Sequence, residues 1–87
     1  MLNGKSVLIT GGTGSFGKKI IETIFDRFNP EKIIVYSRDE LKQFEMQQKW
    51  PDIGDIPIRY FIGDVRDYHR LKMAMTGVDI VVHAAAL

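Results

Sequence analysis

The sequence predicts an α/β fold built on a parallel sheet. Four short apolar runs alternate with three helical patterns along the 87 residues, which gives the order βαβαβαβ. The connections between them are short, so each helix is expected to cross over one face of the sheet with a right-handed turn. We expect residues 1–87 to form the N-terminal part of a doubly wound sheet, with strand order 3-2-1-4 and with strands five onward and any substrate domain absent.

The strands are predicted from short runs rich in β-branched residues, and the helices from apolar residues three or four positions apart. The first helix follows a glycine cluster and ends before Asn29-Pro30, the second ends before Pro51, and the third ends at Gly77. We expect Phe16 in the apolar stripe of the first helix, Leu41 and Phe44 on the inner side of the second, and Tyr68, Leu71 and Met75 on the inner side of the third. The predicted strands span residues 6–9, 33–36, 58–62 and 79–83, and the predicted helices span residues 16–28, 37–49 and 68–75.

Composition excludes several classes of function. The formal net charge is +1 with interspersed signs, which disfavours nucleic acid and membrane surfaces as partners. There is no cysteine, so disulfides and thiolate chemistry are excluded, and a cytoplasmic location is expected. No apolar run approaches the roughly 20 residues of a membrane helix, and the first five residues do not resemble a signal peptide. We therefore expect any anionic partner to be held by a local site.

The glycine cluster points to such a site. Residues 9–17 read ITGGTGSFG, and they lie between the first predicted strand and the first helix. The spacing fits Gly12-x-Gly14-x-x-Gly17 and also Gly11-x-x-Gly14-x-x-Gly17. The first glycine allows a tight exit from the strand, the second lets a pyrophosphate approach the backbone, and Gly17 lets the helix pack closely.

The start of the helix after this loop would bind phosphate. Free backbone N–H groups of Ser15 and Phe16 and the positive end of the helix dipole favour an anion there. The hydroxyls of Thr13 and Ser15 could add hydrogen bonds. The alternative is a glycine-rich turn that only packs tightly.

The end of the second strand predicts which dinucleotide is bound. An acidic residue is expected there for NAD, but the sequence has Ser37-Arg38. A guanidinium pairs well with a 2′-phosphate, so NADP is preferred. Lys42 is a further candidate contact, and Asp39 could accept a hydrogen bond from a ribose hydroxyl. Alternatively, Ser37-x-x-Glu40 is a capping box, and the acidic residues only cap the second helix.

A second carboxylate follows the third strand. Asp64 could accept a hydrogen bond from the adenine amino group, with Val65 beside the ring. The alternative for Asp64 is an Asx turn before the next helix. We expect Arg66 and Asp67 to be surface or capping residues.

No catalytic or metal-binding group is predicted. Tyr68 and Lys72 match the Tyr-x-x-x-Lys pair of many reductases, but this spacing is common by chance and their helix precedes the fourth strand. His69 and His83 have no partner at a meaningful spacing, so neither predicts a metal site or an activated nucleophile.

Four segments give the sequence its family resemblance. LITGGTGSFGKK, IIVYSRDELKQFEMQ, RYFIGDVRD and VDIVVHAAAL resemble the extended short-chain dehydrogenases/reductases with a Rossmann fold, and more closely their inverting UDP-N-acetylglucosamine 4,6-dehydratases of bacterial surface polysaccharide and pseudaminic acid biosynthesis. The resemblance implies NADP as cofactor and a UDP-sugar as substrate. It implies cofactor contacts from Gly11, Thr13, Gly14, Ser15, Phe16, Gly17, Ser37, Arg38, Asp39, Glu40, Leu41, Lys42, Asp64, Val65, Ala84 and Ala85.

The resemblance also implies a reaction. Hydride passes from C4 of the sugar to bound NADP, water is lost across C5 and C6, and hydride returns to C6 with inversion at C5. The family's catalytic residues would lie beyond Leu87, so residues 1–87 alone are expected to be inactive. Another reductase or epimerase of the superfamily, or a non-catalytic nucleotide-binding module, remains an alternative. We also expect a homo-oligomer. Residues 1–87 in isolation are expected to associate, because residues 80–82 predict an apolar strand whose flanking strands and helices would lie beyond Leu87.

Overall fold

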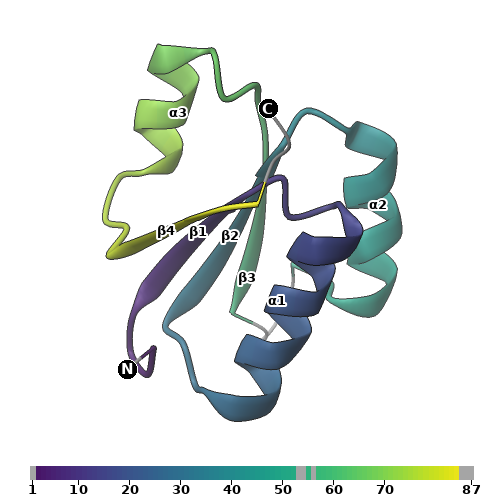
Figure 1. The fold of residues 1–87 in the computed structure, drawn as a ribbon, viewed down its shortest axis with the longest axis vertical. Helices are drawn as coiled ribbons and strands as arrows, with labels where there is room; N and C mark the ends of the chain where they lie inside the picture. Colours follow the sequence, from purple (N-terminus) through teal and green to yellow (C-terminus); the bar gives the residue numbers. More distant parts are fainter. Residues whose placement is uncertain (1, 53–54, 56, 85–87) are drawn as a thin grey trace.

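The computed structural model describes residues 2–52, 55 and 57–84. The described part is an α/β unit with the predicted order of elements (Figure 1). The strands are β1 (Ser6–Thr10), β2 (Lys32–Ser37), β3 (Ile58–Ile62) and β4 (Ile80–His83), and the helices are α1 (Ser15–Arg27), α2 (Glu40–Lys49) and α3 (Tyr68–Ala74).

All four strands are parallel and lie in the order β3-β2-β1-β4, as predicted. β1 is central and pairs with β2 on one side, with Val7 opposite Ile33, and with β4 on the other, with Val7 opposite Ile80. From β1 the sheet continues through β2 to β3 on one side, and the chain then returns to place β4 on the other side of β1. The carboxyl end of β1 therefore lies at the topological switch point of the sheet. This edge of the sheet is where a ligand is expected.

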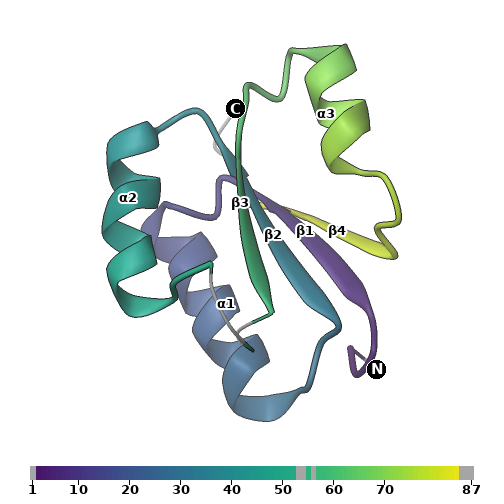
Figure 2. The same cartoon turned by 180° about the vertical axis from the view of Figure 1, so that it is seen from behind.

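Helices cover both faces of the sheet. Figures 1 and 2 show α1 and α2 on one face and α3 on the other. The larger core lies under α1 and α2, where Ile21, Ile24 and Met46 pack on side chains from β1, β2 and β3. The smaller core lies under α3, where Ala74 packs with Leu8, Ile34 and Tyr36. β1 is buried along its whole length, as a strand covered on both faces requires.

Several side chains predicted to face inward are exposed, so these predictions were wrong. Phe16 is 65% exposed, and Leu41 and Phe44 on α2 are also exposed. α2 instead buries Gln43 and Met46. On α3 Ala74 is buried and Leu71 packs partly buried against the smaller core, as predicted, whereas Tyr68 and Met75 are exposed. For α2 the spacing of apolar residues predicted the wrong inner face. The polar Gln43 lies on the packed face instead, where it makes hydrogen bonds to Ser37 and Phe61.

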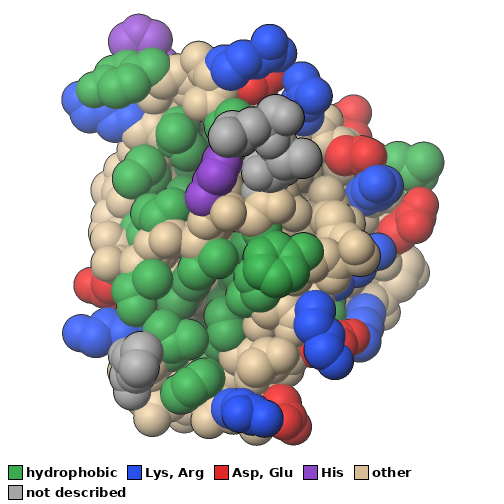
Figure 3. Space-filling model, in the orientation of Figure 1, with side chains coloured by type: hydrophobic (Ala, Val, Ile, Leu, Met, Phe, Trp, Pro, Cys, Tyr) green, Lys and Arg blue, Asp and Glu red, His purple; other side chains and the backbone are tan. Residues whose placement is uncertain are grey.

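β4 is less buried than the other strands. Val81 is 46% exposed, and Ile80 and Val82 are half-buried. Figure 3 shows hydrophobic side chains gathered over this part of the molecule. Among the described residues, no helix is long and apolar enough to cross a bilayer.

Candidate cofactor-binding cleft

A cleft of about 800 Å³ lies at the carboxyl edge of the sheet. This volume falls within the range of about 300–1,000 Å³ that is usual for small-molecule sites. The loops after β1, β2 and β3 form its walls. The cleft is lined by Gly11, Thr13, Gly14, Ser15, Phe16, Tyr36, Ser37, Arg38, Asp39, Lys42, Gly63, Asp64, Val65, Arg66 and Ala84.

The glycine loop owes its shape to two of its glycines in particular. Gly11 has φ +68°, a left-handed conformation that side chains disfavour, and its N–H donates to the Tyr36 carbonyl at 2.9 Å. Gly17 lies beneath the loop, where an added Cβ would be 2.5 Å from Gly12 Cα and 2.7 Å from the Gly11 oxygen. The loop and α1 are therefore in backbone contact, and the Gly11-x-x-Gly14-x-x-Gly17 spacing describes this geometry.

Backbone N–H groups in the first turn of α1 are free to donate hydrogen bonds at the cleft. Gly14 is the N-cap and offers no side chain, and the first bond of the helix runs from Lys18 N–H to the Gly14 carbonyl at 2.9 Å. The N–H groups of Ser15 and Phe16 precede that bond and have no acceptor among the described residues. Both residues line the cleft, and buried Thr13 lies beside them. This arrangement suits an anion.

The residue that caps α2 is not the one that a Ser37-x-x-Glu40 capping box would require. The N-cap of α2 is Asp39, whose Oδ1 accepts from Lys42 N–H at 3.0 Å. The Ser37 hydroxyl is buried and instead accepts from Gln43 Nε2 at 3.1 Å and from Asp39 N–H at 3.3 Å. Arg38, between Ser37 and Asp39, has a side chain 74% exposed at the mouth of the cleft. Ser37 is thus a structural partner of α2, whereas the exposed side chain of Arg38 reaches Asp64, with Nη1 3.3 Å from Oδ2.

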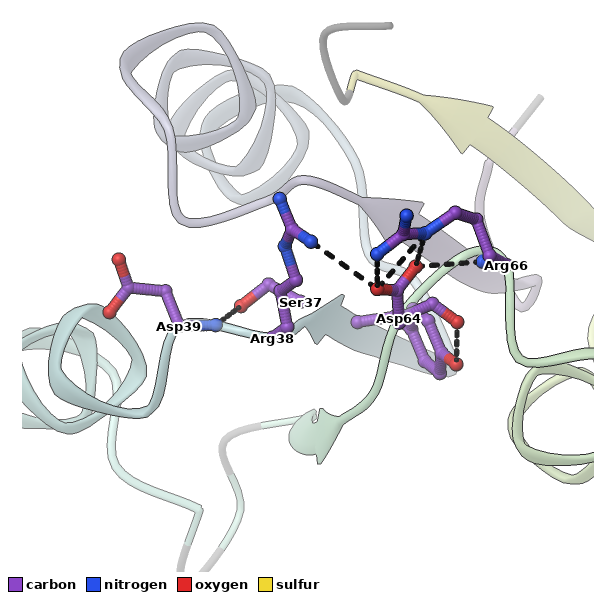
Figure 4. Close-up of polar contacts among 6 residues, drawn as sticks. Ser37, Arg38, Asp39, Asp64 and Arg66 are labelled. Carbon is purple, nitrogen blue, oxygen red and sulfur yellow. Dashed lines mark hydrogen bonds and ion pairs between the residues drawn. The ribbon is translucent and has the colours of Figure 1, made fainter.

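Asp64 forms the turn after β3 and faces Arg38 across the cleft mouth (Figure 4). Its Oδ1 accepts from Arg66 N–H at 2.8 Å, which is the Asx turn considered from the sequence. The side chain of Arg66 donates to both carboxylate oxygens, and its hydrogen bonds, together with that backbone N–H, hold the pKa of Asp64 well below its usual range. Asp67 caps α3 by accepting from Arg70 N–H at 3.1 Å, as predicted.

Tyr36 fixes the position of this turn. Its hydroxyl donates to the Asp64 carbonyl at 2.8 Å, and its ring stacks on Phe61 with centroids 5.7 Å apart. A Cβ on Gly63 would collide with the Tyr36 ring, so only glycine fits this close approach. Burial raises the pKa of the Tyr36 hydroxyl, which therefore stays a proton donor. The turn that carries Asp64 is thereby anchored to β2.

Most residues predicted to contact the cofactor line this cleft, with four exceptions. Glu40 and Leu41 face a different hollow of about 490 Å³ beside α2 and β3, and Gly17 lies under the loop. Ala85 lies outside the described residues. Sequence reasoning missed Tyr36, Gly63 and Arg66 as lining residues. The only sequence signal for them is their place at the carboxyl ends of β2 and β3.

The Tyr68–Lys72 pair lies away from the cleft. Both belong to α3, which covers the other face of the sheet from α1, and Tyr68 is 69% exposed (Figure 1). Within the described ranges, no group of three or more histidines and carboxylates is placed to hold a metal ion.

Comparison with known sequences gives the family context. Residues 7–87 match a family described as "Polysaccharide biosynthesis protein". The chain is 58% identical over its whole length to a UDP-N-acetylglucosamine 4,6-dehydratase (inverting) of Campylobacter jejuni, of which it covers 25%. It is 49% identical to an uncharacterized membrane protein of Methanocaldococcus jannaschii and 43% identical to a UDP-glucose 4-epimerase of Rickettsia bellii; each alignment covers 95% of this chain and 24% of the relative.

Solved structures share the fold. The X-ray structure of Pen from Bacillus thuringiensis matches the whole chain with a TM-score of 0.89 and 41% identity, over 26% of that protein. An NADPH-bound carbonyl reductase from chicken fatty liver matches with a TM-score of 0.79 at 19% identity, over 36% of that protein, and shows the fold alone. The chain thus spans about a quarter of the length of the curated relatives it matches.

Proposed function

The chain belongs to the polysaccharide biosynthesis protein family, and from this premise we propose that it forms the NADP-binding portion of an inverting UDP-N-acetylglucosamine 4,6-dehydratase. The observation that carries the proposal is the placement of Arg38 at the mouth of a cleft whose opposite wall is the glycine loop and the start of α1. The identity to the Campylobacter enzyme over the whole chain supports the choice of reaction.

The cleft supplies the donors that a dinucleotide needs. The free N–H groups of Ser15 and Phe16, the positive end of α1 and the absence of a side chain on Gly14 suit the pyrophosphate. Asp64 and Val65 suit the adenine end, and Ala84, with Ala85, the adenosine ribose. When bound, the nicotinamide would supply reversible hydride transfer with the sugar.

The preference for NADP over NAD rests on the end of β2. Asp39, the acidic residue of this turn, is engaged in capping α2 through its Oδ1. Arg38 and Lys42 give the cleft mouth two cations, and a guanidinium can pair with two oxygens of a 2′-phosphate. Gln43 donates hydrogen bonds to the carbonyl and the hydroxyl of Ser37, and these bonds hold the backbone next to Arg38 in position.

The remaining parts of the proposal concern the whole protein. Its substrate would be a UDP-sugar, it would act in the cytoplasm, and it would assemble as a homo-oligomer. The relatives extend well beyond the matched part, so the groups that move protons on the sugar would come from outside residues 1–87. Residues 1–87 alone are therefore expected to bind cofactor without turnover.

A second candidate is a UDP-glucose 4-epimerase. The identity of 43% to the Rickettsia enzyme favours it, and the cleft described here would serve either reaction. The two reactions differ in their products: a dehydratase gives a 4-keto-6-deoxy sugar nucleotide, whereas an epimerase changes only the configuration at C4.

The test of the reaction uses the full-length protein with NADP and either UDP-N-acetylglucosamine or UDP-glucose. We expect NMR spectroscopy of the products to show a 4-keto-6-deoxy sugar from the first substrate and no epimer from the second. An epimerised product without loss of water would replace the dehydratase by the epimerase.

Cofactor choice is tested separately by calorimetry. Arg38→Ala should weaken NADP binding by about 1.5 kcal/mol, the low end for a charge-assisted hydrogen bond because the side chain is exposed, and should leave NAD binding nearly unchanged. Arg27→Gln, in the last turn of α1, is the charge-matched control. Equal losses for NADP and NAD in Arg38→Ala would contradict the role of Arg38.

A further inference from the structure

Arg66 is an exposed residue, yet its side chain makes all its described hydrogen bonds to one partner, Asp64. Arg66 Nη2 lies 2.8 Å from Asp64 Oδ2, and Arg66 Nε lies 3.1 Å from Oδ1. The backbone N–H of Arg66 adds a bond of 2.8 Å to Oδ1. The side chain of Asp64 is 28% exposed and that of Arg66 is 79% exposed, and the Arg66 guanidinium lies beside the carboxylate (Figure 4).

Arg38 reaches the same carboxylate from β2. Its Nη1 lies 3.3 Å from Asp64 Oδ2, a longer contact than those made by Arg66 (Figure 4). One carboxylate therefore lies between two guanidinium groups at the mouth of the cleft. Because Arg66 already binds both oxygens, Arg38 can leave Asp64 without leaving the carboxylate unpaired.

An unpaired Asp64 would oppose NADP binding in two ways. It would hold Arg38 in an ion pair of its own, and its negative charge would repel a 2′-phosphate bound nearby. Both effects concern the phosphate and not the adenosine, so they would lower affinity for NADP more than for NAD. Asp64 nevertheless has to stay in place, since its turn forms one wall of the cleft.

We propose that Arg66 is the counter-ion that neutralises Asp64 and thereby frees Arg38 for the 2′-phosphate of NADP. This inference rests on the proposed function. It makes Arg66 a positioning residue that sets cofactor specificity through Asp64, without touching the cofactor. Arg38 alone does not give this result, because a guanidinium that pairs with Asp64 is not free to pair with a phosphate.

The test compares dissociation constants for NADP and NAD in the full-length protein, by calorimetry. The readout is the ratio of the two constants, because a lost contact to adenine affects both cofactors equally and cancels. We expect Arg66→Gln to reduce the preference for NADP roughly three- to fivefold, a size typical of charge contacts between exposed side chains. Asp64→Asn combined with Arg66→Gln should restore the preference, and Arg66→Lys should keep most of it.

Two results would overturn the inference. The first is an unchanged ratio in Arg66→Gln. The second is a ratio that stays reduced in the double variant, which would mean that Arg66 contacts the phosphate directly. Arg27→Gln controls for the loss of one positive charge.

The wild-type protein separates this inference from the proposed function. If it shows no preference for NADP, the proposed cofactor is wrong and the inference fails with it. If it prefers NADP and Arg66→Gln does not change that preference, only the role of Arg66 is wrong.

Discussion

The side-chain amide of Gln43 on α2 donates to both the carbonyl oxygen and the hydroxyl of Ser37 at the end of β2, at 3.2 and 3.1 Å. The same Nε2 lies 3.2 Å from the Phe61 carbonyl on β3. Gln43 is buried, so it joins the ends of two strands to the helix that follows Arg38. These hydrogen bonds hold the end of β2 against α2, where Ser37 and Arg38 line the cleft.

Replacing Gln43 should therefore reduce stability. Gln43→Leu removes a buried donor that Ser37 and Phe61 share, which should lower the free energy of unfolding by about 1–3 kcal/mol. Urea denaturation of the full-length protein would measure it. Gln48→Leu on the exposed side of α2 is the control and should change stability by less than about 0.5 kcal/mol. Equal effects of the two substitutions would show that the Gln43 bonds contribute nothing.

Gly17 and Gly14 should respond differently to alanine. A Cβ at Gly17 would press on the Gly12 and Gly11 backbone, so Gly17→Ala should cost about 1–3 kcal/mol of stability. A Cβ at Gly14 would lie 3.5 Å from the Gly11 oxygen, an ordinary contact, so Gly14→Ala should leave stability nearly unchanged and weaken cofactor binding. Thermal unfolding and calorimetry would separate the two effects. A Gly14→Ala protein with full affinity would exclude close approach of a phosphate there.

Asp64 should remain ionised in mildly acidic solution. Hydrogen bonds from Arg66 lower its pKa in the folded state, so its stabilising contribution is complete above the unfolded value of about 3.9 and is lost as the pH falls through the lower, folded value. Carbon NMR of the Asp64 carboxyl group should show no protonation near pH 4. In Arg66→Gln the pKa should rise toward the ordinary value. An Asp64 that titrates normally in the unsubstituted protein would contradict the ion pair.

Residues 1–87 studied as an isolated polypeptide should self-associate. Val81 exposes apolar surface on β4, whose described partner strand is β1 on one side. Exposed apolar edge strands favour pairing with a second copy. Light scattering over a range of concentrations should show dimers or larger species, and Val81→Lys should reduce them. A monomer at every concentration would refute the prediction.

The sequence by itself determined the order of elements, the parallel sheet and the position of the glycine loop. These features depend on local patterns: β-branched runs of the right length, helical spacing, and glycines where the backbone of Gly11 needs a positive φ and that of Gly17 needs close contact. The cleft position follows as well, because parallel strands bring their carboxyl ends to one edge. The family resemblance then indicated which residues at that edge to examine.

Only the tertiary structure decided which side chains face inward and which charges meet. Phe44 and Leu41 looked like the core of α2, but Gln43 is buried there because β2 and β3 present acceptors to it. Arg66 is a surface residue, as predicted, and it pairs with Asp64 two residues before it. The contact that only the fold makes is that of Arg38 with the same carboxylate, 26 residues along the chain. Such contacts depend on distances between separate segments, and no local pattern of residues encodes those distances.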